Sequence, residues 1–237
     1  MAEPLLQVQG LEAHYGRAQI LFGVGLTVGR GEVVALMGRN GAGKTTTIRS
    51  ILGLVERRRG QVRLDGRDIA RLESYEVSRL GIGWVPEDRR IFTDLTVMEN
   101  LEVGRRPPRP DAPTWTVEKL FDLFPNLREM PQRPGGRMSG GEQQMLTVAR
   151  TLMGNPRLVL LDEPSEGVAP LIVEQMAHMI VELKREGLSV LLSEQNIPFA
   201  AAVSDRAYVL EKGQVRFEGT MAELQAAEDV RRQYLTI

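Results

Sequence analysis

The 237-residue chain has no cysteine, which excludes disulfides and cysteine-based metal sites and fits a reducing compartment. It also lacks an excess of either charge. Its 30 Lys and Arg face 31 Asp and Glu, so no overall field attracts nucleic acid or anionic lipid. No apolar run approaches the roughly 18 residues of a membrane-spanning helix. Because Met1–Pro4 lack a basic start and an apolar stretch, we expect no signal peptide and a soluble chain.

The length suits one large domain, or a core with a subdomain, and the order of apolar segments predicts an α/β fold. Apolar stretches from Leu5 to Val28 alternate with glycine and polar residues, which predicts antiparallel strands. Later strands and helices alternate, so we expect a mainly parallel, buried sheet. The predicted strands are Glu32–Met37, Gly81–Val85, Leu158–Asp162 and Ser189–Ser193, and the predicted helices are Lys44–Leu54, Gly141–Met153 and Leu171–Glu186.

The character of the sequence changes between residues 87 and 136. Val97–Val103 and Val117–Leu127 have helical spacing, and the proline-rich segment 105–110 between them cannot be helical. We interpret this region as a helical insertion, and its arginine pairs as a solvated loop rather than a nucleic-acid contact. Near the C-terminus, we expect two short strands around Lys212-Gly213 and then small amphipathic helices.

The glycine-rich segment from Gly38 to Thr45 fits the phosphate-loop pattern G-x-x-x-x-G-K-[ST], between a predicted strand and a predicted helix. Its glycines let backbone N–H groups approach phosphates, and the positive end of the helix points toward them. Lys44 can reach the β- and γ-phosphates, and the Thr45 hydroxyl can bind Mg²⁺. An ordinary glycine-rich turn is the alternative. The residues expected to bind ATP here are Gly38, Arg39, Asn40, Gly41, Ala42, Gly43, Lys44, Thr45 and Thr46.

Two other segments carry candidate site residues. Asp162 ends an apolar run, where it can hold the metal directly or through water, and Glu163 is placed to polarise an attacking water as general base. Two such acids can also simply cap a loop. Ser139–Gln143 lies at the start of a predicted helix. The Ser139 hydroxyl, the two glycines and the N-terminus of that helix can bind a second phosphate. Taken alone, a simple helix cap explains it equally well.

Together these segments resemble the ATP-binding subunits of ABC transporters over essentially the whole chain, with Met138–Gln143 in place of their Leu-Ser-Gly-Gly-Gln signature. The resemblance implies a RecA-like P-loop NTPase core with an N-terminal antiparallel β subdomain and an inserted α-helical subdomain. Residues 1–237 would form a single ABC ATPase domain. Within it, 1–86 and 154–237 form the ATP-binding core and β subdomain, and 87–153 form the helical and signature subdomain.

The resemblance also implies a head-to-tail dimer. In such a dimer, the signature residues of one subunit close on the ATP held by the phosphate loop of the other. Tyr15 lies where the family keeps the aromatic residue that stacks on adenine, with surface packing as the alternative. The signature residues expected to contact the partner's ATP are Ser139, Gly140, Gly141 and Glu142.

Four loop segments resemble the branched-chain amino acid importers within this family: Gly83–Phe92, Leu95–Leu101, Glu163–Pro170 and Ser193–Asn196. In them the usual loop Gln is Glu87, the usual switch His is Gln195, and the usual D-loop aspartate is Ala169.

Each of these departures has a chemical consequence. Glu87 can coordinate Mg²⁺ or water. Gln195 can hydrogen-bond a γ-phosphate but cannot carry a proton at neutral pH, which makes Glu163 the stronger candidate for the base. Ala169 cannot make the polar contact across the dimer that an aspartate makes, which leaves open a weaker activity or an unequal partner that compensates.

We therefore predict an ATPase, using ATP and Mg²⁺, that powers import of branched-chain amino acids. The expected location is cytoplasmic, peripheral on the inner face of the cell membrane. The expected partners are two permease subunits, a second ABC ATPase in a homo- or heterodimer and, indirectly, an extracytoplasmic substrate-binding protein, with no nucleic acid. Alternatives are urea or short-amide importers, ATPases of lipopolysaccharide export, and soluble ABC ATPases acting on DNA or ribosomes. The last class usually carries coiled coils, zinc modules or a second ATPase domain.

Overall fold

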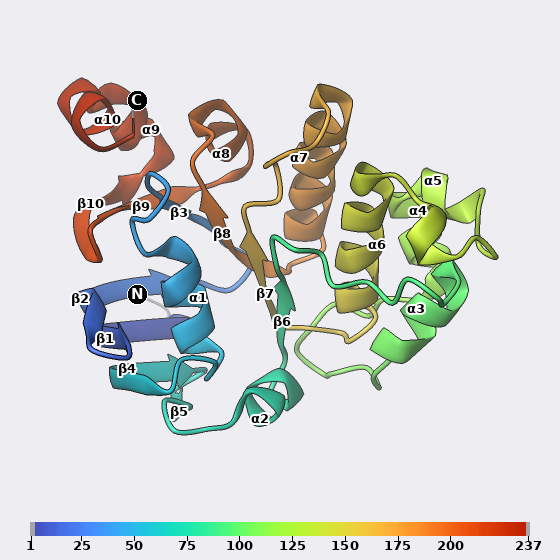
Figure 1. Ribbon diagram of the computed structural model, residues 1–237, viewed down its shortest axis with the longest axis horizontal. Coiled ribbons are helices and arrows are strands. Elements are labelled where there is room, and N and C mark those ends of the chain that lie inside the picture. The colour runs from blue at the N-terminus through green and yellow to red at the C-terminus, as the bar shows by residue number, and fades with distance from the viewer. Residues whose placement is uncertain (1–2, 236–237) are drawn as a thin grey trace.

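The computed structural model describes residues 3–235. The prediction that the chain has no signal peptide rests on Met1–Pro4, and Met1 and Ala2 lie outside the described residues. Two β-sheets organise this part of the chain, with helices α3–α6 grouped beyond β6 (Figure 1). The strands are β1 (Leu6–Tyr15), β2 (Ala18–Val28), β3 (Val33–Met37), β4 (Arg57–Leu64), β5 (Arg67–Asp68), β6 (Ile82–Val85), β7 (Leu158–Asp162), β8 (Ser189–Glu194), β9 (Arg206–Glu211) and β10 (Gln214–Thr220). The helices are α1 (Lys44–Ile51), α2 (Ser74–Arg79), α3 (Val97–Gly104), α4 (Val117–Leu123), α5 (Pro125–Arg128), η1 (Gly135–Arg137), α6 (Gly140–Leu152), α7 (Pro170–Arg185), α8 (Ile197–Val203), α9 (Met221–Ala226) and α10 (Glu228–Tyr234).

The first sheet is antiparallel, in the order β2-β1-β4-β5, which confirms the predicted N-terminal antiparallel sheet. Its strands bury one face and leave the other polar, as alternating sequences do. The sequence did not reveal β4, because it begins with Arg57-Arg58-Arg59 and buries only Val62 and Leu64.

The second sheet has the order β10-β9-β3-β8-β7-β6, and every neighbouring pair is parallel except β9 and β10. Its central strands β3 and β7 are buried throughout, because side chains cover both faces. Leu158 and Leu160 pack toward α1 and the first sheet, whereas Val159 and Leu161 pack toward α6 and α7. The same strand therefore anchors two hydrophobic cores.

Three strands of this sheet end side by side. Asp162 at the end of β7 is in register with Ser193, and Met37 at the end of β3 is in register with Glu194. In an open parallel sheet, ligands bind beyond the carboxyl ends of the strands. The chain segments that follow β3, β7 and β8 therefore meet at one edge, where the predicted carboxylates Asp162 and Glu163 lie.

Two predicted helices differ from the structure. The segment 117–127 is not one helix, because Pro125 cannot continue the hydrogen bonds of α4 and the preceding Phe124 leaves the helical conformation. The break produces α4 and α5. Helix α1 ends at Ile51 instead of Leu54, because the backbone turns back and the Leu54 N–H donates to the Arg49 carbonyl at 2.8 Å.

The helices of the described chain are all too short or too polar to cross a membrane.

Candidate active site

The phosphate-loop segment connects β3 to α1 in a conformation that requires glycine at two positions. Gly43 caps α1 with φ 108°, a value that side chains disfavour. At Gly38, a Cβ atom would lie 2.5 Å from the carbonyl oxygen of Leu210, which is too close for any other residue. The glycine spacing of the sequence thus corresponds to a specific backbone path, one that leads directly into the N-terminus of a helix.

Lys44 opens α1 and points back over the loop. Its side chain is 3 % exposed, and Nζ donates to the carbonyls of Gly38 at 2.7 Å and Arg39 at 3.1 Å. Nζ also lies 3.1 Å from Oε1 of Glu163. The loop therefore holds a buried positive charge at its centre, next to the first residue after β7.

Thr45 and Asp162 place a hydroxyl and a carboxylate oxygen beside this lysine. The Thr45 hydroxyl donates to Oδ1 of Asp162 at 3.0 Å, and Asp162 is 1 % exposed. Burial raises the pKa of Asp162, and the nearby carboxylates of Glu163 and Glu87 raise it further, whereas the bond from Thr45 lowers it. The carboxylates of Asp162, Glu163 and Glu87 thus lie close together, near the buried Lys44.

Glu163 follows β7 in an unusual backbone conformation. Its φ is 48°, in the left-handed region, and its N–H donates to the Ser193 carbonyl at 3.0 Å. A turn closes when the Glu166 N–H bonds the Glu163 carbonyl at 3.1 Å, which brings the two carboxyl groups together. Hydrogen bonding to Glu163, with burial and the neighbouring acids, raises the pKa of Glu166 to about 7.

Gln195 and Glu87 approach this group from two other strands. Gln195 follows β8, and its Nε2 lies 3.5 Å from Oε2 of Glu166. Glu87 follows β6 and is exposed, yet its charge acts on both Asp162 and Glu166. The structure thus brings Glu87, Asp162 and Glu163 close to Gln195, although they lie at or beyond the ends of three different strands.

A cavity of about 280 Å³ opens over the loop. Tyr15, at the end of β1, forms one side of it and is 46 % exposed, so its ring is available to a ligand. The cavity is lined by Tyr15, Ile20, Gly41, Gly43, Lys44, Thr45, Thr46 and Glu163. Residues Arg39 and Asn40 lie exposed at the tip of the loop.

The signature segment lies elsewhere, at the start of α6. Ser139 is the N-cap: its hydroxyl accepts from the Glu142 N–H at 3.3 Å, and its own N–H donates to Oε2 of Glu142 at 2.7 Å. Gly140 and Gly141 form the first turn of the helix. Within the described chain, none of these residues lines the cavity over the phosphate loop. The structure does not bring the two segments that are predicted to bind phosphate together in one subunit.

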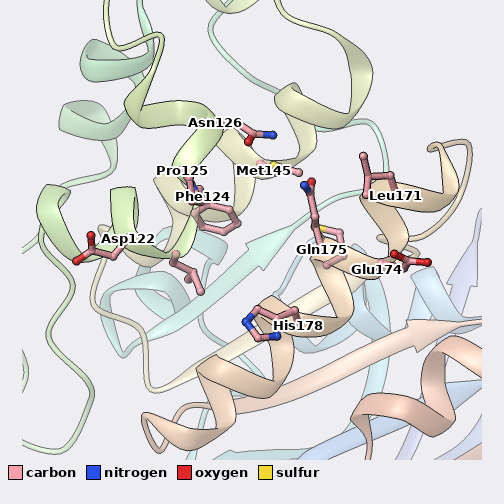
Figure 2. A pocket seen from close by; sticks show the side chains of 11 residues that line it. Asp122, Phe124, Pro125, Asn126, Met145, Leu171, Glu174, Gln175 and His178 are labelled. Atoms are coloured by element: carbon pink, nitrogen blue, oxygen red, sulfur yellow. The ribbon is translucent and has the colours of Figure 1, made fainter.

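A second pocket, of about 380 Å³, lies between α4–α5 and α7 and is separate from these residues. Figure 2 shows Phe124, Gln175 and His178 around it. In the described chain, its lining includes none of the residues predicted to bind or hydrolyse ATP.

Sequence reasoning missed three polar residues of the site: Ser165, Glu166 and Glu194. Glu194 is 1 % exposed and accepts hydrogen bonds from Ser165 and from the backbone at Gln195. A signal was available, because Glu194 ends an apolar strand just as Asp162 does, and it lies in the segment Ser193–Asn196 that resembles importers.

Comparison with known proteins identifies the family. The family model described as ABC transporter matches residues 21–166, which is more than half of the chain. The chain belongs to the ABC transporter family. It is 42 % identical over 231 residues to the high-affinity branched-chain amino acid transport ATP-binding protein BraG of Pseudomonas aeruginosa, covering 98 % of this chain and 99 % of the relative. This membership makes the chain an ATP-hydrolysing ABC subunit.

Two other relatives of this ABC ATPase carry different cargoes in their names, one lipopolysaccharide and the other branched-chain amino acids, as in BraG. The lipopolysaccharide export system ATP-binding protein LptB of Haemophilus influenzae is 36 % identical over 98 % of this chain and 97 % of its own length. The probable branched-chain amino acid transport ATP-binding protein LivF of Archaeoglobus fulgidus is 36 % identical over 93 % and 94 %. Among solved structures, an ABC transporter cassette in its ADP conformation has a TM-score of 0.80 at 28 % identity, covering 98 % of both chains. These likenesses confirm the predicted fold class and the ATPase activity.

Proposed function

We propose that this ABC ATPase powers the uptake of branched-chain amino acids (Leu, Ile and Val) through an importer in the cell membrane. The observation that carries the proposal is the 42 % identity to BraG over nearly all of both chains. Gln195, in place of the usual switch histidine, also favours this group over the lipopolysaccharide exporters, which usually retain that histidine.

The cavity over the phosphate loop is the proposed ATP site. Tyr15 stacks on adenine, the loop N–H groups of residues 38–46 bind the phosphates, and Lys44 reaches the β- and γ-phosphates. Lys44 is pre-positioned for this role, because loop carbonyls and Glu163 already fix its ammonium group.

The donor set beside Lys44 fits Mg²⁺. Thr45 and Asp162 offer a hydroxyl and a carboxylate oxygen 3.0 Å apart, and crowded acids make a divalent cation favourable there. Thr45, Asp162 and Glu87 would hold the ion, which would neutralise charge on the phosphates. This donor set consists only of oxygens, the ligands that Mg²⁺ prefers.

Glu163 is the proposed general base and Gln195 the residue that orients the water or contacts the γ-phosphate. Glu163 is nearly buried and ion-paired to Lys44, so its carboxylate is oriented at the mouth of the phosphate cavity. Gln195 has only an amide to offer, so its contribution is a hydrogen bond and not a proton.

The signature residues Ser139, Gly140, Gly141 and Glu142 are proposed to act on the ATP of a partner subunit. Their separation from the cavity over the loop supports a composite site between two subunits. The partner is a second copy of this chain or a related ATPase. Residues 87–153 serve as the helical and signature subdomain of the single ABC ATPase domain 1–237, and 1–86 with 154–237 as its core and β subdomain.

The helical subdomain and segment 86–101 are proposed to contact two permease subunits, which places the chain on the cytoplasmic face of the membrane. A hollow of about 340 Å³ between β6, α3 and α6 supports such a contact. Arg90 stacks over Trp84 and Arg150 over Phe92 at its rim, and Phe92 is 47 % exposed. Aromatic and arginine side chains of this kind are enriched at protein interfaces. A substrate-binding protein outside the cell would deliver the cargo.

Uptake of labelled amino acids tests the proposal. Cells that lack this chain are expected to lose leucine uptake and to regain it with the wild-type chain but not with Glu163→Gln. Labelled urea is the parallel substrate. Restored uptake of urea but not leucine would reassign the cargo to the short-amide class, and unchanged uptake of both with a defect in the outer membrane would reassign the chain to lipopolysaccharide export.

A further inference from the structure

Glu194 is a buried carboxylate at the carboxyl end of the central sheet. It ends β8, is 1 % exposed, and is in register with Met37 of β3. The residue before it, Ser193, is in register with Asp162 of β7. Glu194 therefore lies between the strand that enters the phosphate loop and the strand that delivers Asp162 and Glu163.

Both oxygens of this carboxylate accept two hydrogen bonds. Oε1 accepts from the Ser165 N–H at 3.2 Å and from the Ser165 hydroxyl at 2.5 Å. Oε2 accepts from the Gln195 N–H and from the Asn196 N–H, each at 2.9 Å. An ionised carboxylate has about four acceptor positions, so its capacity is filled.

None of the ion pairs between residues 3 and 235 includes Glu194. Its charge is held by three backbone N–H groups and one hydroxyl, and hydrogen bonds to an ionised acceptor are about twice as strong as neutral ones. The two oxygens of this carboxylate accept hydrogen bonds from different segments, since Ser165 follows β7 and Gln195 follows β8. Glu194 consequently ties the two segments to each other.

Ser165 lies inside the turn that carries the proposed base. That turn is closed by the hydrogen bond from the Glu166 N–H to the Glu163 carbonyl at 3.1 Å. On the other side, the Gln195 side chain reaches Glu166 only through a long contact of 3.5 Å. The Glu163 N–H also bonds the Ser193 carbonyl at 3.0 Å, which joins the backbones of the two segments. Beyond that bond, the strong side-chain connection between the base segment and the Gln195 backbone runs through Glu194 and not through the side chains that face the cavity.

We infer that Glu194 is a positioning residue for ATP hydrolysis, which fixes Gln195 relative to Glu163 through Ser165. The inference rests on the proposed roles of Glu163 and Gln195. Gln195 cannot transfer a proton, so its contribution depends on where its amide is held. A displacement of about 1 Å at a reacting centre can cost roughly 100-fold in rate, so a link of this kind controls turnover.

Steady-state ATP turnover of the full chain tests the link. Glu194→Gln keeps the shape but turns an NH₂ group toward N–H or O–H donors, so kcat is expected to fall about 10- to 100-fold while KM for ATP changes little. Ser165→Ala removes one of the four bonds and is expected to lower kcat less. Ser165→Thr retains the hydroxyl and is expected to retain most of the turnover.

Glu32→Gln is the matched control for the loss of a carboxylate that holds a turn. Glu32 accepts from the Gly29 N–H at 2.6 Å and pairs with Arg206 at 3.4 Å, at the opposite end of β3. Melting temperature is measured for every variant. Glu32→Gln is expected to lower the melting temperature without lowering kcat, whereas Glu194→Gln lowers kcat more than any shared loss of stability explains.

The outcomes separate this inference from the proposed site. If Glu163→Gln abolishes turnover and Glu194→Gln does not lower kcat, the inference is wrong and the base assignment stands. If Glu163→Gln keeps full turnover, the proposed base is wrong. Equal losses of kcat and melting temperature in Glu32→Gln and Glu194→Gln would make Glu194 only structural. Ser165→Ala added to Glu194→Gln is expected to lower kcat no further, because both act through one link.

Discussion

Oε1 of Glu163 lies 3.1 Å from Nζ of Lys44, and the two side chains are 7 % and 3 % exposed. The pair joins the helix after the phosphate loop to the segment after β7. Lys44 has two further acceptors, the carbonyls of Gly38 and Arg39. Glu163 has no other cation within ion-pair distance in the described chain, and its Oε2 is buried without a hydrogen-bond partner there. Removing Lys44 therefore leaves Glu163 without a cation, whereas removing the charge of Glu163 leaves Lys44 with two hydrogen-bond acceptors.

Lys44→Met is expected to weaken both ATP binding and the fold. The change leaves Glu163 buried without its cation, and breaking a buried pair in this way costs roughly 3 kcal/mol of unfolding free energy. Loss of a charged donor to phosphate lowers ATP affinity at least about tenfold. Urea unfolding and equilibrium binding of ATP measure the two effects. Normal ATP affinity in a folded Lys44→Met variant would contradict the proposed phosphate contact.

Glu163→Gln is expected to have the opposite profile. The amide oxygen still accepts from Lys44, so unfolding free energy changes by less than about 1 kcal/mol and ATP still binds. Turnover falls by about 100-fold or more, because general base catalysis contributes roughly that factor. Glu129→Gln, at an exposed position, is the control and is expected to leave turnover intact. Unchanged turnover in Glu163→Gln would falsify the assignment of the base.

Glu166 is expected to make stability depend on pH. Its pKa is about 7 in the folded chain against an ordinary value of 4.5, so the folded state keeps a proton that the unfolded state releases. Stability from this group is therefore fully present below about pH 4.5 and is lost as pH rises through about 7. Glu166→Gln cannot lose that proton. The difference in unfolding free energy between wild type and Glu166→Gln should therefore shift against the wild type across this window, and parallel pH curves would show that Glu166 titrates normally.

The fold was predictable where local pattern and tertiary burial agree. Leu158–Asp162 is β7 at the predicted residues, because a continuous apolar run matches a strand covered on both faces. The apolar pattern failed to predict β4, because this strand begins with three arginines although it pairs antiparallel to β1. It also failed at Pro125, where the backbone restriction that proline imposes overrides the helical spacing of the apolar residues.

The arrangement of the candidate site was predictable for residues that belong to a motif. Thr45 and Asp162 meet as the phosphate-loop pattern requires, although 117 positions separate them. Glu166 and Glu194 were missed because their roles depend on the register of β7 with β8 and on a turn that reverses the chain. The place of Glu194 at the end of an apolar run is visible in the sequence, but the strand register and the turn that give these residues their contacts are not.

Ser139 and Thr220 head two helices with the same capping arrangement, which allows a matched comparison. Thr220 accepts from the Glu223 N–H at 3.1 Å, and its own N–H donates to Glu223 at 2.7 Å, as Ser139 does with Glu142 at 3.3 and 2.7 Å. Replacing either cap by alanine is expected to lower unfolding free energy by about 1 kcal/mol. Only Ser139 belongs to the proposed contact with a partner's ATP.

Ser139→Ala is therefore expected to lower ATP turnover by about 10- to 150-fold, because a lost hydrogen bond to a charged phosphate costs roughly 1.5–3 kcal/mol. Thr220→Ala is expected to leave turnover unchanged. Urea unfolding and steady-state ATP hydrolysis on both variants measure the two effects. Mixing Ser139→Ala with Glu163→Gln subunits adds a direct test of action between subunits. In a head-to-tail dimer, the mixed dimer pairs both defects at one ATP site and restores a wild-type pair at the other. Part of the lost activity should then return, and a mixture no more active than the two variants alone would exclude a composite site.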